Sequence, residues 1–293
     1  MATKERKIEV YRLTISGLPE GLAYNSFLLS LRGENRPIAQ MVMKSGEKWH
    51  AIVDVVIRNH RLKLRFMSYT KGHRPDILDT DRFSLQPNPL TPTQTGVEWT
   101  HVLGNSLNGR YLLLIERNQG GIWPSTLETY FQWMIDKFYE TEISVAKEDN
   151  NPVCVSLEAE PGPEFLARVN GLDKITEASV RVVRPNPGWR DLDTELGVVA
   201  EQSDAHKAEI IMKARKRSVL DRHKGILDWI KSKFAAKELD YAAVKGQRGD
   251  RRDSFNTKQL AKREVIKMEI DERGQVIAED AWNKMSKMMG DLD

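Results

Sequence analysis

The alternation of apolar and polar residues is clearest between Val97 and Phe138, where it predicts two strands followed by a helix. Residues 97–102 alternate in character, which is typical of a strand packed on one side. Residues 111–115 form an unbroken apolar run, which favours a strand covered on both faces. Gly104-Asn105-Ser106 and Asn108-Gly109 supply turn residues between the two runs. We therefore expect an antiparallel hairpin in the middle of a sheet.

A broad apolar stripe follows, and it predicts a helix of about four turns that covers this sheet. Its members are Leu127, Tyr130, Phe131, Met134, Ile135 and Phe138. Between the second strand and the helix lie four polar residues and two glycines, 116–121. Strand ends beside a helix start are common binding positions, so Arg117, Asn118 and Gln119 are candidate binding residues. The alternative is that they only cap the sheet edge and hydrogen-bond the turn.

The remaining patterns predict short strands and helices on both sides of a polar, acidic segment at residues 140–152. Before it we expect strands at 8–16, 38–43, 51–57 and 62–69 and a helix at 24–31. After it we expect strands at 153–157, 175–183, 207–214, 239–244 and 262–270, with helices at 163–169, 192–200, 218–234 and 278–289.

This order predicts an α+β protein with two β-rich halves, residues 1–145 and 152–293. We expect mostly antiparallel sheets, each covered by amphipathic helices. The second half has the order of a split β-α-β domain, with a basic face.

Composition indicates a soluble globular protein, since 40% of the 293 residues are hydrophobic and 30% are charged. No apolar run approaches the roughly 20 residues that span a bilayer. The charged N-terminal segment is not followed by the apolar core of a secretory signal. Cys154 is the single cysteine, so no internal disulfide can form. We expect a cytoplasmic protein without membrane association.

The net charge of +3 hides an asymmetry along the chain. Residues 207–267 hold 18 Lys and Arg against 8 Asp and Glu, whereas the remainder holds 27 against 34. A basic block on an acidic body predicts an anionic partner. The alternative is that basic residues merely flank two amphipathic elements.

Nucleic acid is the partner that the residues of this block favour. The predicted helix 218–234 carries cations on both sides of its apolar stripe with Trp229 beside them, and the predicted loop 247–253 adds arginines. Trp189 lies between two arginines in another loop. An aromatic ring can stack on a base while cations contact phosphates. The candidate nucleic-acid-binding residues are Arg217, Arg222, Lys224, Trp229, Lys233, Arg248, Arg251 and Arg252. Alternatively, Trp229 packs beneath a loop and the cations are only solvated.

Motifs of nucleotide-binding and hydrolytic enzymes are absent from the sequence. Weak catalytic candidates are Asp54, Glu98 and Glu116, which all lie on predicted strands. Converging carboxylates could hold Mg²⁺ for phosphodiester cleavage. The basic residues of strand 62–69 could bind an anion or could be neutralised by acidic neighbours such as Asp54.

The predicted helix 278–289 gathers alanine, tryptophan and methionine on one side. Such an adaptable apolar face either seals a core or docks to another protein, including a second copy.

The sequence favours a binding protein over an enzyme. The leading hypothesis is a nucleic-acid-binding accessory protein, such as those of bacteria, phages or mobile elements, that contacts its ligand without sequence preference through the basic second half. The alternatives are a protein–protein or oligomerisation module and a metal-dependent nuclease. We expect no cofactor, apart from Mg²⁺ in the nuclease case.

Overall fold

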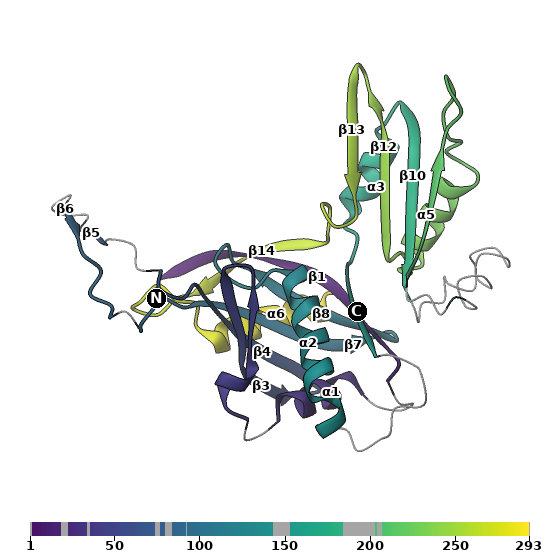
Figure 1. The fold of residues 1–293 in the computed structure, drawn as a ribbon. Helices are drawn as coiled ribbons and strands as arrows, with labels where there is room; N and C mark the ends of the chain where they lie inside the picture. The colour runs from purple at the N-terminus through teal and green to yellow at the C-terminus, as the bar shows by residue number, and fades with distance from the viewer. Residues whose placement is uncertain are drawn as a thin grey trace.

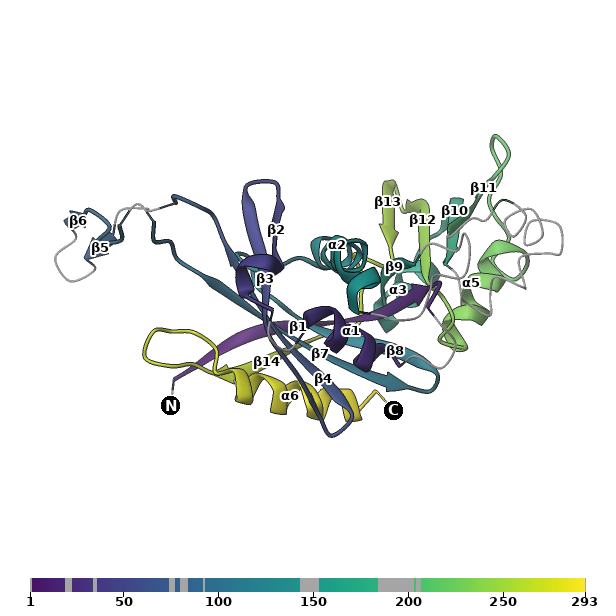
Figure 2. The same ribbon diagram turned by 60° about the horizontal axis from the view of Figure 1, so that its bottom comes forward.

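The computed structural model describes residues 2–18, 23–33, 36–73, 77–79, 84–91, 93–142, 153–183, 203 and 207–292. It is an α+β fold with two main antiparallel sheets, one large and one small (Figure 1). The predicted fold class is confirmed at this level. A two-stranded ribbon of β5 (Ile77–Asp79) and β6 (Ser84–Gln86) stands apart from both sheets (Figure 2).

The large sheet has the strand order β14-β1-β8-β7-β4-β3-β2, and β9 also pairs with β1. Its strands are β1 (Thr3–Ser16), β2 (Val42–Ser45), β3 (Lys48–Arg58), β4 (Arg61–Tyr69), β7 (Glu98–Leu107), β8 (Arg110–Arg117), β9 (Cys154–Ala159) and β14 (Arg263–Glu269). The predicted hairpin is β7–β8, and the φ of 50° at Asn108 and 73° at Gly109 accounts for its tight turn.

The long strand β1 joins parts of the chain that are far apart in sequence. One side of β1 pairs with β8, while β14 pairs along Thr3–Glu9 and β9 along Tyr11–Ser16. The chain therefore leaves the large sheet after β9 and returns to it at β14. The small sheet is an insertion between these two strands, so the sheets do not divide at the polar segment 140–152.

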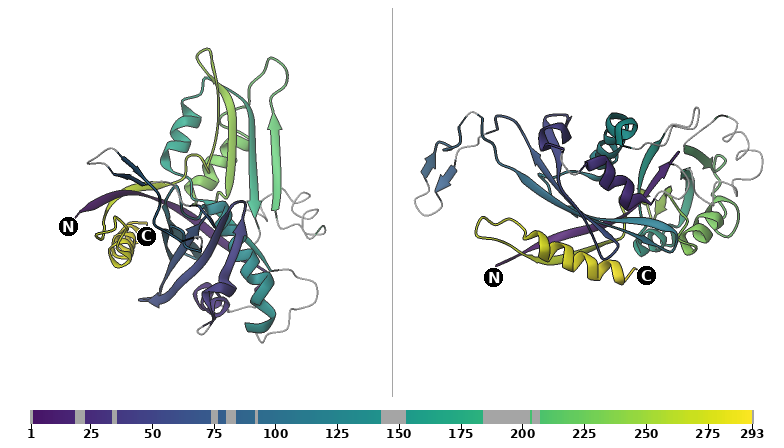
Figure 3. Two further views of the ribbon diagram at one scale, coloured as in Figure 1. Left: turned by 60° about the vertical axis from the view of Figure 1, so that its left-hand side comes forward. Right: turned by 90° about the horizontal axis from the view of Figure 1, so that it is seen from below.

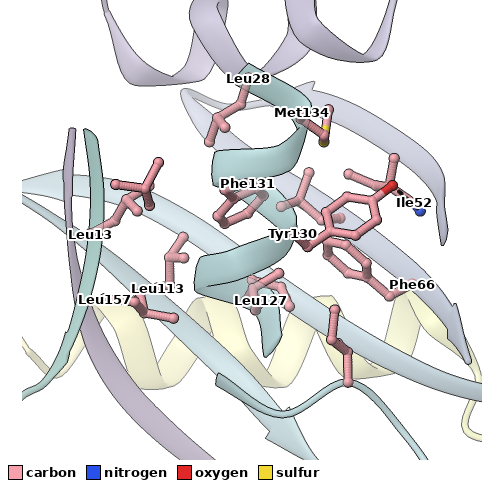
Figure 4. Packing of buried hydrophobic residues seen from close by; sticks show 14 of the residues in the cluster. Leu13, Leu28, Ile52, Phe66, Leu113, Leu127, Tyr130, Phe131, Met134 and Leu157 are labelled. Atoms are coloured by element: carbon pink, nitrogen blue, oxygen red, sulfur yellow. Dashed lines mark hydrogen bonds between the residues drawn. The ribbon is translucent and has the colours of Figure 1, made fainter. Parts of the chain in front are cut away.

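One core lies between the large sheet and α2 (Pro124–Glu142), with α1 (Tyr24–Arg32) beside it (Figure 4). The predicted apolar stripe of α2 is buried there. Tyr130 anchors the helix, because its hydroxyl donates to the Met41 carbonyl at 2.6 Å and accepts the Ile52 N–H at 3.0 Å. The Phe66 ring packs edge-on against Tyr130 with centroids 5.3 Å apart.

A second core forms on the opposite face of the same sheet, against α6 (Ala278–Gly290) (Figure 3). The buried residues of α6 are Ala281, Trp282, Met285, Met288 and Met289. The predicted helix is confirmed, and it closes a core of the large sheet instead of the predicted second half. Its apolar side is covered within one chain.

The small sheet has the order β11-β10-β12-β13. Its strands are β10 (Lys174–Val183), β11 (Lys207–Lys213), β12 (Tyr241–Arg248) and β13 (Arg251–Asn256). The helices α3 (Pro163–Asn170) and α5 (Ile226–Ala235) share its core, to which Phe165, Ile230 and Phe255 contribute. The predicted helix 192–200 and Trp189 lie outside the described residues.

Three local predictions were wrong. The helix predicted from Ser218 begins at Ile226, because Gly225 adopts a φ of 65° that ends any helical continuation from residues before it. The strand predicted at 38–43 is a 3₁₀ helix, Ile38–Met41, followed by β2. The charged loop predicted at 247–253 is the β12–β13 hairpin, with Gly249 at a φ of 57° in its turn.

Buried His50 predicts a stability that depends on pH. Its Nδ1 lies 2.7 Å from the Ser68 hydroxyl, and burial, together with the charge of Lys48, lowers the pKa of His50 from 6.5 to about 4. Below pH 6.5 the unfolded chain binds a proton that the folded chain excludes, so stability is lost as pH falls from 6.5 to 4. Allowing for partial solvent screening, we expect a loss of about 2 kcal/mol.

Urea unfolding at a series of pH values measures this loss. His50→Gln should show a flatter dependence between pH 6.5 and 4, whereas the exposed His223→Gln should match the unaltered protein. Equal slopes for His50→Gln and the unaltered protein would contradict the assignment.

Candidate nucleic-acid interface

Three segments of the small sheet meet at its end away from the large sheet, which we call the distal end (Figure 1). They are residues 168–174, 214–224 and 248–253. The strand register explains why they meet, since Lys174 at the start of β10 pairs with Gln247 near the end of β12. Lys213, at the end of β11, pairs with Glu177 near the start of β10. Segments that are far apart in the chain therefore lie together at the same end of the small sheet.

The distal end is rich in cations. Its three segments contain ten Lys and Arg and four Asp. Within the described part of the chain, no ion pair holds any of the seven exposed cations Arg215, Lys216, Arg217, Lys224, Arg248, Arg251 and Arg252. Their positive charges are therefore not offset by a contacting carboxylate, and they can attract an anionic partner.

The turn of the β12–β13 hairpin is fixed by a neighbouring carboxylate. Asp173 accepts the backbone N–H of Gly249 at 2.6 Å. Arg248 and Arg251 lie directly opposite each other on the two strands that leave this turn. Like charges directly opposite across a strand pair are destabilising, so the hairpin holds two arginines at a cost.

Two arginines also lie at the C-terminal end of α3. Arg222 donates to the carbonyl of Asn170 at 3.1 Å. Arg248 lies beside Gly171, the residue that caps this helix: its guanidinium carbon is 3.7 Å from the position that a Cβ would occupy there. Cations at a helix C-terminus interact favourably with the helix dipole. Part of the charge at the distal end therefore has a structural role.

Two of the eight candidate residues lie elsewhere. Lys233 is buried near the other end of α5, with its ammonium group 2.9 Å from Glu238. Trp229 is partly buried and packs against the small core, as in the alternative interpretation of that residue. The other six, Arg217, Arg222, Lys224, Arg248, Arg251 and Arg252, lie at the distal end. Sequence reasoning missed Arg215 and Lys216, although they form a run of three cations with Arg217.

A hollow of 410 Å³ adjoins the distal end on the face of the small sheet opposite the helices. Lys245, Gln247, Arg252 and Ser254 contribute to its lining. Arg252 belongs to both features, so the cationic end continues into a polar depression.

A cleft of 680 Å³ lies between the two sheets, and its two arginines already contact carboxylates. Arg12 contacts Asp240 at 2.9 Å and the Leu239 carbonyl at 2.8 Å. Arg110 contacts Glu160 at 3.0 Å. These contacts join the small sheet to the large one and leave the arginines of this cleft no free charge for an anion.

The three candidate metal-binding carboxylates have separate partners. Asp54 contacts Arg65 at 2.5 Å, and Glu98 accepts from the Asn118 amide at 2.9 Å. Glu116 is buried against His101. No group of three or more His, Cys, Asp or Glu in the described part of the chain is arranged to hold a metal ion.

Two of the three basic residues of β4 have acidic neighbours, which was the alternative to an anion-binding face. Arg65 contacts Asp54, and Lys63 contacts Glu279 of α6 at 3.3 Å. Lys63 also lies over the Trp282 ring, 5.1 Å from its centroid.

Arg117, Asn118 and Gln119 surround the turn before α2. Asn118 donates to the Trp99 carbonyl at 3.2 Å, and its own carbonyl accepts the Gly121 N–H at 3.1 Å. Arg117 lies over the Trp123 ring at 3.9 Å, and Gln119 is exposed. These contacts organise the turn, which is the structural role considered for these residues.

Among known proteins, the sequence matches no family model and no curated relative. None of the described helices is both long enough and apolar enough to cross a membrane.

Proposed function

We propose that this protein binds nucleic acid without sequence preference through the distal end of its small sheet. The observation that carries the proposal is the grouping, at one end of one sheet, of seven exposed cations that lack carboxylate partners among the described residues. By contrast, Lys63 and Arg65 of β4, and Arg12 and Arg110 of the cleft between the sheets, contact carboxylates. The contrast favours a polyanionic ligand at the distal end.

The β12–β13 hairpin adds a second argument. Arg248 opposite Arg251 is an unfavourable pair in the free protein, and a bound phosphate between them would relieve the repulsion. Arginine guanidinium groups match phosphate geometry through two parallel hydrogen bonds. Base-specific contacts are not implied, since exposed basic side chains contact the backbone of any sequence.

A salt titration tests the proposal. Fluorescence anisotropy with labelled single-stranded and double-stranded oligonucleotides of mixed sequence should show binding at low salt. Because each phosphate contact releases a counterion, about six contacts should weaken binding roughly 10³-fold between 50 and 200 mM salt. Absence of binding to both oligonucleotides at 50 mM salt would overturn the proposal, as would an affinity that salt leaves unchanged.

A further inference from the structure

The free edge of β11 has the features of an interface. β11 pairs with β10 on one side, and no strand of the described chain pairs with its other side. On the paired side, the Ala214 N–H donates to the backbone carbonyl of Thr176 in β10 at 2.8 Å. Backbone groups two residues apart point the same way in a strand, so Glu209, Ile211 and Lys213 present their N–H and C=O groups outward. An edge of this kind is a template for another strand.

The same edge exposes apolar side chains. Ile211 is 56% exposed and Met212 is 44% exposed. The opposite edge of the small sheet is β13, where the exposed Arg251 and Arg252 have the same sign, which discourages pairing. The exposed Glu209 and Lys213 of β11 have opposite signs and can pair across two copies. Of the two edges, β11 is the one suited to association.

The sequence of β11 is complementary to itself in one antiparallel register. When Ile211 faces its own copy, Ile210 faces Met212 and Glu209 faces Lys213 on each side of the axis. The outward-pointing backbone groups of Glu209, Ile211 and Lys213 then form hydrogen-bonded pairs. Shifting the axis to residue 210 would instead place Lys207 opposite Lys213.

The charges of the neighbouring strands extend this complementarity. Arg181 of β10 contacts Glu209 at 3.3 Å, while Glu177 of β10 contacts Lys213 at 3.6 Å and Lys245 of β12 at 2.7 Å. In the self-paired register, Glu209 of one copy would lie opposite Lys213 of the other. A row of charged residues would then run across the joined sheet, through Arg181 and Glu209 of one copy and Lys213, Glu177 and Lys245 of the other. The row across the joined sheet alternates in sign at every strand, which is favourable for cross-strand pairs.

We propose that β11 pairs with β11 of a second copy about a two-fold axis at Ile211, joining two four-stranded sheets into one continuous sheet. This inference is independent of nucleic-acid binding, because dimerisation is measured in the absence of nucleic acid. A single pair of short strands buries less surface than a permanent dimer does, so the dimer should form at roughly micromolar concentrations.

Charge-exchanged variants test the register. Glu209→Lys places two lysines opposite each other on each side of the axis, and Lys213→Glu places two glutamates there. Each variant alone should dimerise about tenfold more weakly than the unaltered chain in sedimentation velocity. An equimolar mixture restores both opposite-charge pairs, so it should regain an affinity within about threefold of the unaltered chain.

Ile211→Lys is a second variant, and its 56% exposure makes it compatible with folding. It should be monomeric, whereas Val265→Lys on the edge of the large sheet, where Val265 is 62% exposed, should dimerise as the unaltered chain does. Circular dichroism confirms that each variant is folded. The proposal is overturned if the unaltered chain stays monomeric up to about 1 mM. A mixture no stronger than its components, or a dimer unaffected by Ile211→Lys, also overturns it.

Discussion

Replacing Glu116 by alanine should lower the free energy of unfolding by about 3–5 kcal/mol. Glu116 is fully buried on β8, and one oxygen lies 2.7 Å from His101 Nδ1 and accepts the His101 N–H at 3.1 Å. Its other oxygen lies 2.9 Å from Arg6 Nε. Removing the carboxylate leaves the buried Nε of Arg6 and the buried His101 backbone N–H without their partner.

Urea unfolding followed by circular dichroism measures this loss. Glu116→Gln keeps the shape and one acceptor oxygen, so its loss should be smaller than that of the alanine variant. Glu164→Ala is the matched control, because this α3 side chain is 65% exposed and lies as far as 3.9 Å from Arg263. It should change stability by less than about 0.5 kcal/mol. A loss below about 1 kcal/mol for Glu116→Ala would contradict the structural role.

The parts of the fold that sequence reasoning predicted well depend on local patterns. The alternation before Asn108, the apolar run after it and the helical stripe from Leu127 to Phe138 each determine an element by themselves. They correspond to β7, β8 and α2. The strand β14 and the helix α6 were also predicted as elements, within a residue or two of their ends.

The pairing of distant elements was not predictable in the same way. β1 is fourteen residues long, and one side of it has room for both β9 and β14. Alternation shows that a strand has an apolar face, but it does not show which strand completes its hydrogen bonds. The insertion of the small sheet between β9 and β14 follows from that non-local choice.

The candidate site shows the same division. The excess of basic residues between 207 and 267 was evident in the sequence, whereas the grouping at the distal end depends on the register of β10 with β11 and β12. The apolar pattern of residues 218–234 predicts that Lys233 and Trp229 lie beside the apolar face of one helix. In the structure α5 begins at Ile226, and the packing of both residues follows from its contact with the small core.

The distal end differs from the large sheet in whether its charged side chains have partners of opposite charge. In the large sheet, charged residues such as Glu116 and Lys63 are buried with partners. At the distal end, like charges are placed opposite each other in the β12–β13 hairpin. Arg58 also lies opposite Arg61 across the β3–β4 turn, but Arg58 contacts Glu279 at 3.6 Å. Arg248 and Arg251 have no carboxylate partner among the described residues, so a bound phosphate would offset their repulsion.

Arg251→Glu/Arg252→Glu should therefore separate binding from stability. The glutamate introduced at position 251 would lie opposite Arg248, where it replaces a repulsive cross-strand pair by an attractive one, so stability should be unchanged or rise by a few tenths of a kcal/mol. Affinity for an oligonucleotide at about 50 mM salt should fall about 50-fold, because two phosphate contacts are lost and two repulsive charges are added. The slope of log affinity against log salt should become shallower by about two.

Lys4→Glu/Arg273→Glu is the matched control, since it changes the net charge equally at two exposed positions outside the distal end. Its affinity should stay within about threefold of the unaltered protein, because screening at this salt confines such charges to short range. If both double variants lost affinity equally, net charge would govern binding and the distal end would not be the interface. If neither lost affinity, the ligand would bind elsewhere on the molecule.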